Sequence, residues 1–527
     1  MTRNVIVAAL VFVAPLSGAA QGHTHPQSAA TERLGTAHFA TSCNPAVSAK
    51  FDRAITLLHS FEFGAAITGF NDVLAADSTC AMAHWGIAMS RWSNPMATGS
   101  RSASQLKQGK IAADAALRLS DRVTERERGY IRAVGQLYSD HESASQQART
   151  AAYERAMGEL AASQPADTEA TILHAISLVA SASPTDKTYA NQRKAGGILE
   201  ALWIQQPNHP GLAHYIIHSY DYPALAPQAS AAARRYAEIA PSAAHALHMP
   251  SHTFTRIGLW KQSVETNRRS VEAALRTSSM AEALHASDYA AYAYLQMRND
   301  SAARRILNQL PSIAARFDVN AITGAAPGFA GVFALAAIPA RYALERDAWK
   351  EAAALKPSPS DFPYTDAMTY FARSIGASRT GDAAKAREAI DSLKSINQRL
   401  TAAKEEPYWA EQVAIQHLAA SAWLDLAEGR QDSALAHMRE AANREDAIEK
   451  SAVSPGPLAP AREMLGDMLM ELKRPGEALT EYRATLAKEP NRYRATSGAM
   501  RAAAASGDRK AESEYRAKLK TLTARAM

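Results

Sequence analysis

The sequence predicts an all-α fold, a right-handed α-solenoid of roughly a dozen helical pairs. The first observation is periodicity, because apolar residues recur at helical spacing, and valine and isoleucine do not alternate with polar residues as in strands. The second is composition, which is rich in alanine and contains only 7% aromatic residues. The third is length, because 527 residues exceed one ordinary compact core, whereas stacked helical pairs can extend along the chain.

Helix-breaking residues divide the chain into pairs. Residues 51–61 form one expected helix and residues 63–75 its partner, and Asp77, Ser78 and Thr79 then cap a third helix over residues 80–92. Tracing the breakers onward places the first helices of successive pairs near residues 46, 79, 125, 167, 210, 243, 281, 328, 364, 411, 459 and 492. These intervals lie near or somewhat above the ~34 residues of a tetratricopeptide unit.

The tetratricopeptide pattern is clearest near the C-terminus. It consists there of Leu465, Gly466, Pro475, Gly476, Ala478, Tyr482 and Pro490. In this pattern small residues let paired helices approach closely, and large residues fill the space between them. We expect an N-terminal solenoid over residues 45–311, which carries a histidine-rich groove, and a C-terminal solenoid over residues 312–527.

The first residues are expected to be removed from the mature protein. Arg3 precedes an apolar run over residues 5–16 and small residues over 17–20, the pattern of a secretory signal peptide cleaved after Ala20. Residues 21–44 are polar and aperiodic, so we expect a flexible leader. No segment is long and apolar enough to span a bilayer. We therefore expect a periplasmic or secreted protein.

Charge and cysteine content narrow the class of protein further. The formal net charge of +6 is a weak bias over this length, and no block of Lys or Arg indicates a nucleic-acid partner. Cys43 and Cys80 are the only cysteines and each precedes an expected helix. Because export places the chain where disulfides persist, we expect these two cysteines to be bonded.

Histidines are concentrated in one stretch of the chain. Of sixteen histidines, six lie between residues 209 and 252, namely His209, His214, His218, His245, His248 and His252. Residues four apart on a helix point to one side. In a tetratricopeptide solenoid the first helices of successive pairs line the concave face. The helices expected near residues 210, 243 and 281 would therefore gather these imidazoles in one groove, together with His285.

Imidazole is the commonest metal ligand in proteins, so the cluster predicts a metal site. The preferred ligands are His214, His218, His248 and His252, and the remaining candidates are His245, His285, Asp221 and Asp288, the two aspartates as outer-shell partners or additional ligands. Because both cysteines are assigned to a disulfide, no cysteine is available as a ligand. Zinc, copper, nickel and iron therefore all remain candidates for the metal. Pro250 falls inside the second of these helices, where it is expected to break the helix beside His248 and His252.

Several passages resemble a family of exported bacterial tetratricopeptide-repeat proteins of largely unassigned activity. The resemblance covers nearly the whole mature chain and rests on residues 51–61, 80–90, 209–223, 241–260, 285–296 and 455–470. It implies the solenoid fold and little about function. Family members more often carry histidine where this chain has Ser451, so the resemblance does not support a ligand role for that passage.

Two other functions remain open at this level. One is an exported adaptor that holds a protein or peptide segment in the groove while the histidines serve structure, and the other is a metal-dependent hydrolase or oxidase. Phosphate-binding loops, the His-Glu-x-x-His motif and the Gly-x-Ser-x-Gly elbow are all missing from the sequence. Tyr408 and Trp409 are expected to be packing residues. Glu445, Asp446 and Glu449 are expected to form a solvated helix face.

Overall fold

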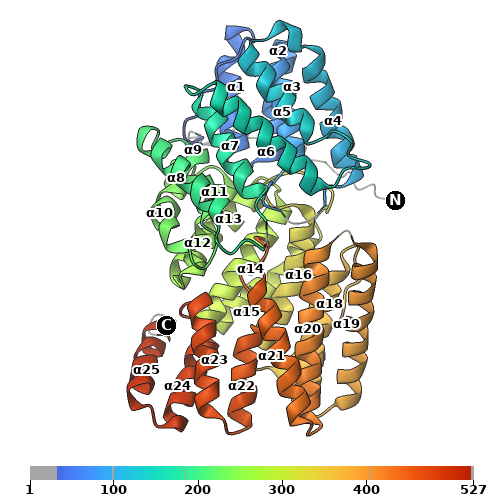
Figure 1. The fold of residues 1–527 in the computed structure, drawn as a ribbon, viewed down its shortest axis with the longest axis vertical. Helices are drawn as coiled ribbons and strands as arrows, with labels where there is room; N and C mark the ends of the chain where they lie inside the picture. The colour runs from blue at the N-terminus through green and yellow to red at the C-terminus, as the bar shows by residue number, and fades with distance from the viewer. Residues whose placement is uncertain (1–31, 98–99, 184, 405, 524–527) are drawn as a thin grey trace, which may run out of the picture. The chain divides into compact units, whose positions relative to one another are not determined.

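The computed structural model describes residues 32–523, apart from 98–99, 184 and 405. The described residues contain helices and no strand, and Arg33–Met527 form one compact unit (Figure 1). The predicted all-α solenoid is therefore confirmed. The proposed signal peptide and residues 21–31 of the leader lie outside the described residues.

The N-terminal part of the unit consists of consecutive helical pairs. Its α-helices are α1 (Ser48–His59), α2 (Phe63–Ala76), α3 (Ala81–Trp92), α4 (Ala103–Arg118), α5 (Glu125–Gln136), α6 (Gln146–Ser163), α7 (Thr168–Ala180) and α8 (Ala190–Gln205), with short 3₁₀ helices at Pro45–Val47 and Ser120–Arg122. Each helix packs against the next, and α1 and α3 also pack against each other. Side-chain caps begin several helices, such as the reciprocal box between Thr124 and Glu127 at α5.

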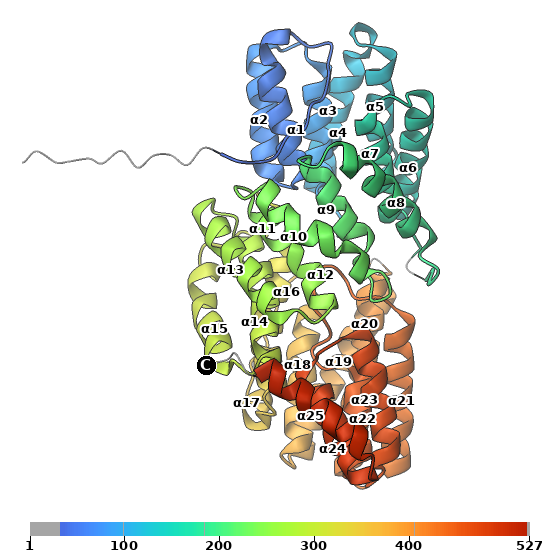
Figure 2. The same cartoon turned by 90° about the vertical axis from the view of Figure 1, so that its left-hand side faces the viewer.

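The central part contains shorter and more irregular helices. They are α9 (Pro210–Ser219), α10 (Ser230–Ile239), α11 (Ala244–His248), α12 (Pro250–Arg256), α13 (Trp260–Arg276), α14 (Met280–Gln296), α15 (Asp300–Ala314) and α16 (Gly328–Leu344), with a 3₁₀ helix at Ala226–Ala229. Helix α12 contacts α9, α10, α13 and α14, and Figure 2 shows these elements grouped in the middle of the unit.

The C-terminal part returns to regular pairs. It consists of α17 (Trp349–Ala353), α18 (Pro363–Arg379), α19 (Ala383–Ala403), α20 (Pro407–Ala427), α21 (Gln431–Ala447), α22 (Ala461–Glu471), α23 (Pro475–Lys488), α24 (Tyr493–Ser506) and α25 (Arg509–Thr523). The twelve expected first helices correspond to α1, α3, α5, α7, α9, α11, α14, α16, α18, α20, α22 and α24, and each begins within a few residues of its predicted position.

Close contacts between small and aromatic residues hold the pairs together. A Cβ added at Gly86 would lie 2.3 Å from the ring of Phe70, and one at Gly498 would lie equally close to Tyr482. Gly466 faces the same tyrosine ring from α22. The small-and-large pattern therefore reflects steric requirements at the helix contacts.

The expected flexible leader is wrong for residues 33–44. Phe39 is only 3% exposed and its ring packs among those of Phe51, Trp85 and Tyr130. The backbone N–H of Thr36 also donates to the carbonyl of Asn208. The buried aromatic ring and the backbone hydrogen bond together hold this segment against the helices.

The predicted disulfide is confirmed, since Cys43 and Cys80 are bonded. The expected boundary at residue 312 does not separate compact units, because α14 and α16 pack directly on each other across it. Among the described helices, none combines the length and apolar character needed to cross a bilayer.

Candidate metal centre

Six buried histidines come together in the central part of the unit. His214 and His218 lie on α9, His245 and His248 on α11, His252 on α12 and His285 on α14. Each of the six side chains belongs to a residue that is at most 5% exposed. Helix α9, the broken helix α11–α12 and helix α14 are the first members of three successive pairs. The solenoid arrangement therefore accounts for the meeting of residues that are up to 71 positions apart (285 − 214).

The break at Pro250 shapes this region. Helix α11 ends at His248 and α12 begins at Pro250, with Met249 between them. Proline has no N–H with which to continue the hydrogen bonds of α11. The two short helices nevertheless leave His248 and His252 facing each other, with 3.1 Å between their Nε2 atoms.

The first group of histidines is His214, His218 and His245. The Nδ1–H of His214 donates to the backbone carbonyl of His59 at 2.7 Å, and the Nδ1–H of His245 donates to Glu282 at 3.1 Å. A carbonyl can only accept, so the proton of neutral His214 lies on Nδ1. The Nε2 atoms of His214 and His245 then carry lone pairs, and they face each other at 3.2 Å.

The second group, His248, His252 and His285, repeats this arrangement with different partners. His248 donates from Nδ1 to Oδ1 of Asn267 at 2.6 Å, and His252 donates from Nδ1 to Asp221 at 2.9 Å. The amide of Asn267 is oriented by its own Nδ2, which donates to the carbonyl of Ser263. Both Nε2 atoms of this pair are therefore also free of protons when the imidazoles are neutral.

Each group has a third imidazole whose buried nitrogen makes no hydrogen bond. The atoms are Nε2 of His218 in the first group and Nδ1 of His285 in the second. In each group the candidate ligand atoms all lie within 4.8 Å of one another. Buried polar atoms normally find partners, so such an orphan beside two facing lone pairs makes each group a candidate metal site.

Electrostatics favours neutral imidazoles next to ionised carboxylates. Burial lowers the pKa of His214, His218, His252 and His285, and burial together with His252 lowers that of His248 to about 3. Burial opposes ionisation of Glu282 and Asp221. However, His245 lowers the pKa of Glu282 to about 2, and Lys450 and Arg256 bring that of Asp221 well below its usual range.

The spacing of the facing nitrogens suits metal ligation. Two nitrogens each ~2.05 Å from one ion are 3.1–3.2 Å apart when the angle at the ion is about 100°. That angle lies close to the tetrahedral value. The Nδ1 partners hold each ring in place, as the outer-shell acceptors of metal-bound histidines do.

The structure distributes the predicted ligands between the two groups. His214 and His218 join His245, whereas His248 and His252 join His285, so the four preferred ligands do not form one set. Asp221 is not among the grouped ligand atoms, and its carboxylate instead accepts a hydrogen bond from Nδ1 of His252. Asp288 does not reach either group, because its carboxylate pairs with the buried Arg341 at 3.2 Å.

A third cluster contains residues that the sequence argument did not choose as ligands. Nε2 of His59 lies 2.9 Å from Oε2 of Glu169, and Nε2 of His209 lies 2.9 Å from Oε1 of the same carboxylate. Nδ1 of His59 lies 3.1 Å from the hydroxyl of Tyr215. Burial would raise the pKa of Glu169, but the two imidazoles bring it below its usual value. Here the facing Nε2 atoms are already hydrogen-bonded to a carboxylate, although Nδ1 of His209 is buried without a hydrogen bond. The cluster therefore differs from the central groups in having no facing lone pairs.

The outer-shell residues were harder to predict from sequence. Glu282 precedes His285 by three residues and so lies on the same helix face, which means that the sequence spacing alone could have identified it. Glu62 and Asn267 carried no such signal. Glu62 accepts from the backbone N–H of His245 at 3.1 Å, and burial together with the charge of Glu282 raises its pKa to about 7.

A loop from the C-terminal part, residues 448–460, covers the histidines. The hydroxyl of Tyr289 lies 3.0 Å from the carbonyl of Ala452 and 3.1 Å from that of Ser454. Ala452 and Val453 also line a cavity whose wall includes four of the six histidines. The site is therefore closed by a segment that lies more than 230 residues after His214, its first candidate ligand, along the sequence.

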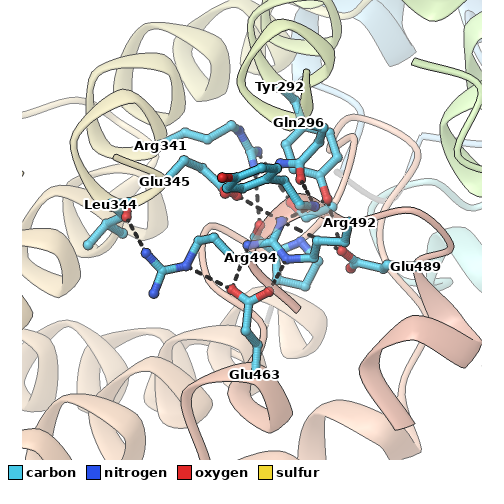
Figure 3. Close-up of polar contacts among 12 residues, drawn as sticks. Tyr292, Gln296, Arg341, Leu344, Glu345, Glu463, Glu489, Arg492 and Arg494 are labelled. Atoms are coloured by element: carbon cyan, nitrogen blue, oxygen red, sulfur yellow. Dashed lines mark hydrogen bonds and ion pairs between the residues drawn. The ribbon is translucent and has the colours of Figure 1, made fainter. Parts of the chain in front are cut away.

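Buried ion pairs fix the base of this loop (Figure 3). Arg341 donates to the carbonyls of Gly456 and Pro457. Arg492 is fully buried and lies 2.7 Å from both Glu345 and Glu463. Removing one member of such a network would leave a buried charge unpaired, so the network holds α16, α22 and α24 in one arrangement.

A larger cavity borders the same loop and corrects one expectation. Its wall includes Tyr408, Trp409, Glu445 and Glu449. Glu445 accepts from the N–H of Ala461, and burial raises its pKa to about 7, so the expected solvated face of carboxylates is wrong at this residue. Trp409 stacks on Tyr364 with 4.1 Å between ring centroids, in agreement with a packing role.

Comparisons with known proteins describe the fold alone. The chain matches no protein-family profile and no curated protein. Among solved structures it is similar to a human IFIT1 dimer with m7Gppp-AAAA at 12% identity, with a TM-score of 0.39 over 84% of this chain and 90% of that chain. Yeast Tom70 is 12% identical, with a TM-score of 0.37 over 88% and 96% of the two chains.

The APC/C hetero-tetramer Cut9-Hcn1 is also 12% identical, with a TM-score of 0.33 over 91% of this chain and 88% of that chain. These scores are too low to support any inference about function. The helix pairs and their contacts identify the chain, on its own structure, as a tetratricopeptide-like helical-repeat protein.

Proposed function

We propose that this protein binds divalent transition-metal ions at its two three-histidine groups. The observation that carries the proposal is the repeated pairing of Nε2 atoms, at 3.2 Å in one group and 3.1 Å in the other. All four rings already use Nδ1 for an outer-shell acceptor, so their Nε2 atoms have no other partner. A metal ion would satisfy both lone pairs and the third, unpartnered imidazole.

The competing explanation is one extra proton in each group. A protonated imidazole could donate from Nε2 to its neighbour across the same 3.1–3.2 Å. This would place a positive charge in a buried site, and burial lowers the pKa of His214 and His248. At neutral pH this favours neutral His214 and His248, and neutral imidazole is the form that binds metals.

The donor set limits the choice of ion. Neutral imidazole nitrogens suit zinc, copper, nickel and iron, whereas calcium and magnesium prefer oxygen ligands. Three protein ligands leave at least one coordination position for a small exogenous ligand. The groups therefore resemble sites that hold an ion for chemistry or transfer more than sites that only brace a fold.

We also infer that the protein acts outside the cytoplasm. The support is the secretory pattern over residues 1–20 together with the Cys43–Cys80 disulfide, which persists best in an oxidising compartment. Cell fractionation and N-terminal sequencing test this inference. The expected result is an exported chain that begins at Gln21, and an uncleaved cytoplasmic chain would contradict it.

Metal analysis of protein purified without a histidine tag tests the binding proposal. We expect two equivalents of a transition metal per chain, and one equivalent in His214→Ala or in His252→Ala. His174→Ala is the matched control, because His174 pairs with Glu154 away from both groups and its loss should leave the content unchanged. Folded protein that takes up no metal, even when metal is supplied, would refute the proposal.

A further inference from the structure

We infer that the two histidine groups form one dinuclear centre, in which a small anion bridges two metal ions. This inference rests on the proposed metal binding and goes beyond it, because two separate sites could each bind an ion independently. Three observations support a single centre, namely the spacing of the rings, the shared cavity and the local charge.

Some rings of different groups are no farther apart than the most widely spaced rings of the first group. Between the groups, the ring centroids are 5.8 Å apart for His245 and His248, and 6.3 Å apart for His218 and His252. Within the first group, the largest separation is 6.4 Å, between His218 and His245. Ions bound by adjacent groups at this spacing would be near enough to share a ligand.

One cavity opens onto both groups. It is lined by His218 and His245 from the first group and by His252 and His285 from the second. Apart from Asn94, the rest of its lining is apolar, including Met249, Ala330 and Val453. The space suits a ligand of about the size of one or two water molecules. A small ligand placed there would face ions on both sides.

The net positive charge expected around two bound metal ions would favour an anion between them. All six ligands are imidazoles, which bring no negative charge to two divalent ions. The carboxylates that contact these rings are Asp221 and Glu282, and Asp221 is already paired with Arg256 at 2.9 Å and lies 3.7 Å from Lys450. Excess positive charge in a buried site is costly. A bridging hydroxide, formed when bound water releases its proton to solvent, would reduce this cost.

Copper(II) ions provide a probe for the bridge, because two copper(II) ions coupled through one ligand lose their paramagnetic signal. The full-length mature protein is loaded with copper(II), and total copper is compared with the copper that gives an electron paramagnetic resonance signal. We expect two copper ions per chain and a signal that accounts for only a small part of them.

Variants that disable one group supply the control. His214→Ala removes a ligand of the first group and His285→Ala one of the second, so either should leave one copper per chain with its full signal. Two variants from different helices keep the test valid if one of them fails to fold by circular dichroism.

The possible failures are distinguishable. Two copper ions with full signal in the wild-type chain would overturn the dinuclear centre and leave metal binding intact. One copper ion per wild-type chain would also overturn it. Folded protein that binds no copper and no other transition metal would overturn both proposals.

Discussion

The six central histidines and the cluster of His59, Glu169 and His209 are both buried and both have the composition of a metal site. They differ in which atoms face each other. In the outer cluster, each Nε2 meets a carboxylate oxygen at 2.9 Å. In the central groups, Nε2 meets Nε2 at 3.1–3.2 Å, and every anchoring acceptor is taken by Nδ1.

The difference shows that a count of nearby histidines does not identify a metal site. A carboxylate between two imidazoles satisfies both donors and stabilises the fold without any ion. Two facing lone pairs remain unsatisfied until a cation or a proton is added. Mutations in the cluster of His59, Glu169 and His209 should therefore change stability whether or not metal is present. Mutations in the central groups should change stability mainly when metal is bound.

The largest effect is expected from Glu169→Ala. Two buried N–H donors would lose their acceptor, and removal of one member of a buried ionic cluster typically costs about 3–5 kcal/mol. Urea unfolding should show this loss equally with and without a chelator, while metal content stays at the wild-type value. Glu169→Gln keeps one acceptor and should lose less. A chelator-dependent loss would mean that this cluster also binds metal.

The next effect is expected from His252→Ala, and it should depend on metal. A ligand that binds only the folded state stabilises it by about 2.7 kcal/mol when its concentration is 100 times Kd. The wild-type protein should therefore melt at higher temperature with metal than with chelator, and the variant should lose part of that difference. An equal drop in Tm under both conditions would assign His252 a structural role.

A smaller effect is expected from the outer shell. Asn267→Ala removes the acceptor that orients His248, and the loss of such a partner typically weakens metal affinity ~10–100-fold. Competition titration with a chromophoric chelator measures this change. Asn397→Ala offers a comparison, because Asn397 donates to the carbonyl of Ala410 far from the histidines, and it should leave affinity unaltered. Equal affinities in the two variants would contradict an outer-shell role for Asn267.

The most gradual effect is the pH dependence of the metal-free protein. Burial lowers the folded-state pKa of His214, His218 and His285 below 6.5. The unfolded chain therefore binds more protons below pH 6.5, and stability should fall as pH decreases from that value. Glu169 has a folded-state pKa below 4.5, so its contribution is present above pH 4.5 and is lost below it.

Chelator-treated protein unfolded in urea at a series of pH values separates these two windows. Glu169→Gln should flatten the change below pH 4.5 and leave the change below pH 6.5. A stability that stays constant between pH 6.5 and pH 5 would contradict buried neutral imidazoles.

The sequence was most informative where local spacing determines structure. Helix starts follow from breakers and caps, and the pairing of His214 with His218 follows from the helical repeat. The division of the ligands into two groups could not be predicted, because it depends on how α11 and α12 cross α9 and α14. Asp288 shows the same limit, since its partner Arg341 lies 53 residues away in sequence.

Polar residues that join distant segments were also beyond prediction. Glu169 contacts His59, which is 110 positions away in the sequence, and His209, which is 40 positions away. Glu62 contacts the backbone of His245, which is 183 positions away. Phe39 illustrates the opposite case, because its segment was expected to be flexible from its composition, whereas buried aromatic contacts and hydrogen bonds to distant residues fix it in place. Local periodicity predicts individual helices well. A site built from several helices can be predicted only when the way in which those helices cross is known.

Anomalous diffraction from crystals grown with a transition metal, recorded at the absorption edge of that metal, tests the central claim most directly. Two peaks are predicted, one within reach of Nε2 of His214 and His245 and the other within reach of Nε2 of His248 and His252. No peak is predicted at Glu169. Crystals that show no peak at either histidine pair, or a single peak at His59, Glu169 and His209, would contradict the account.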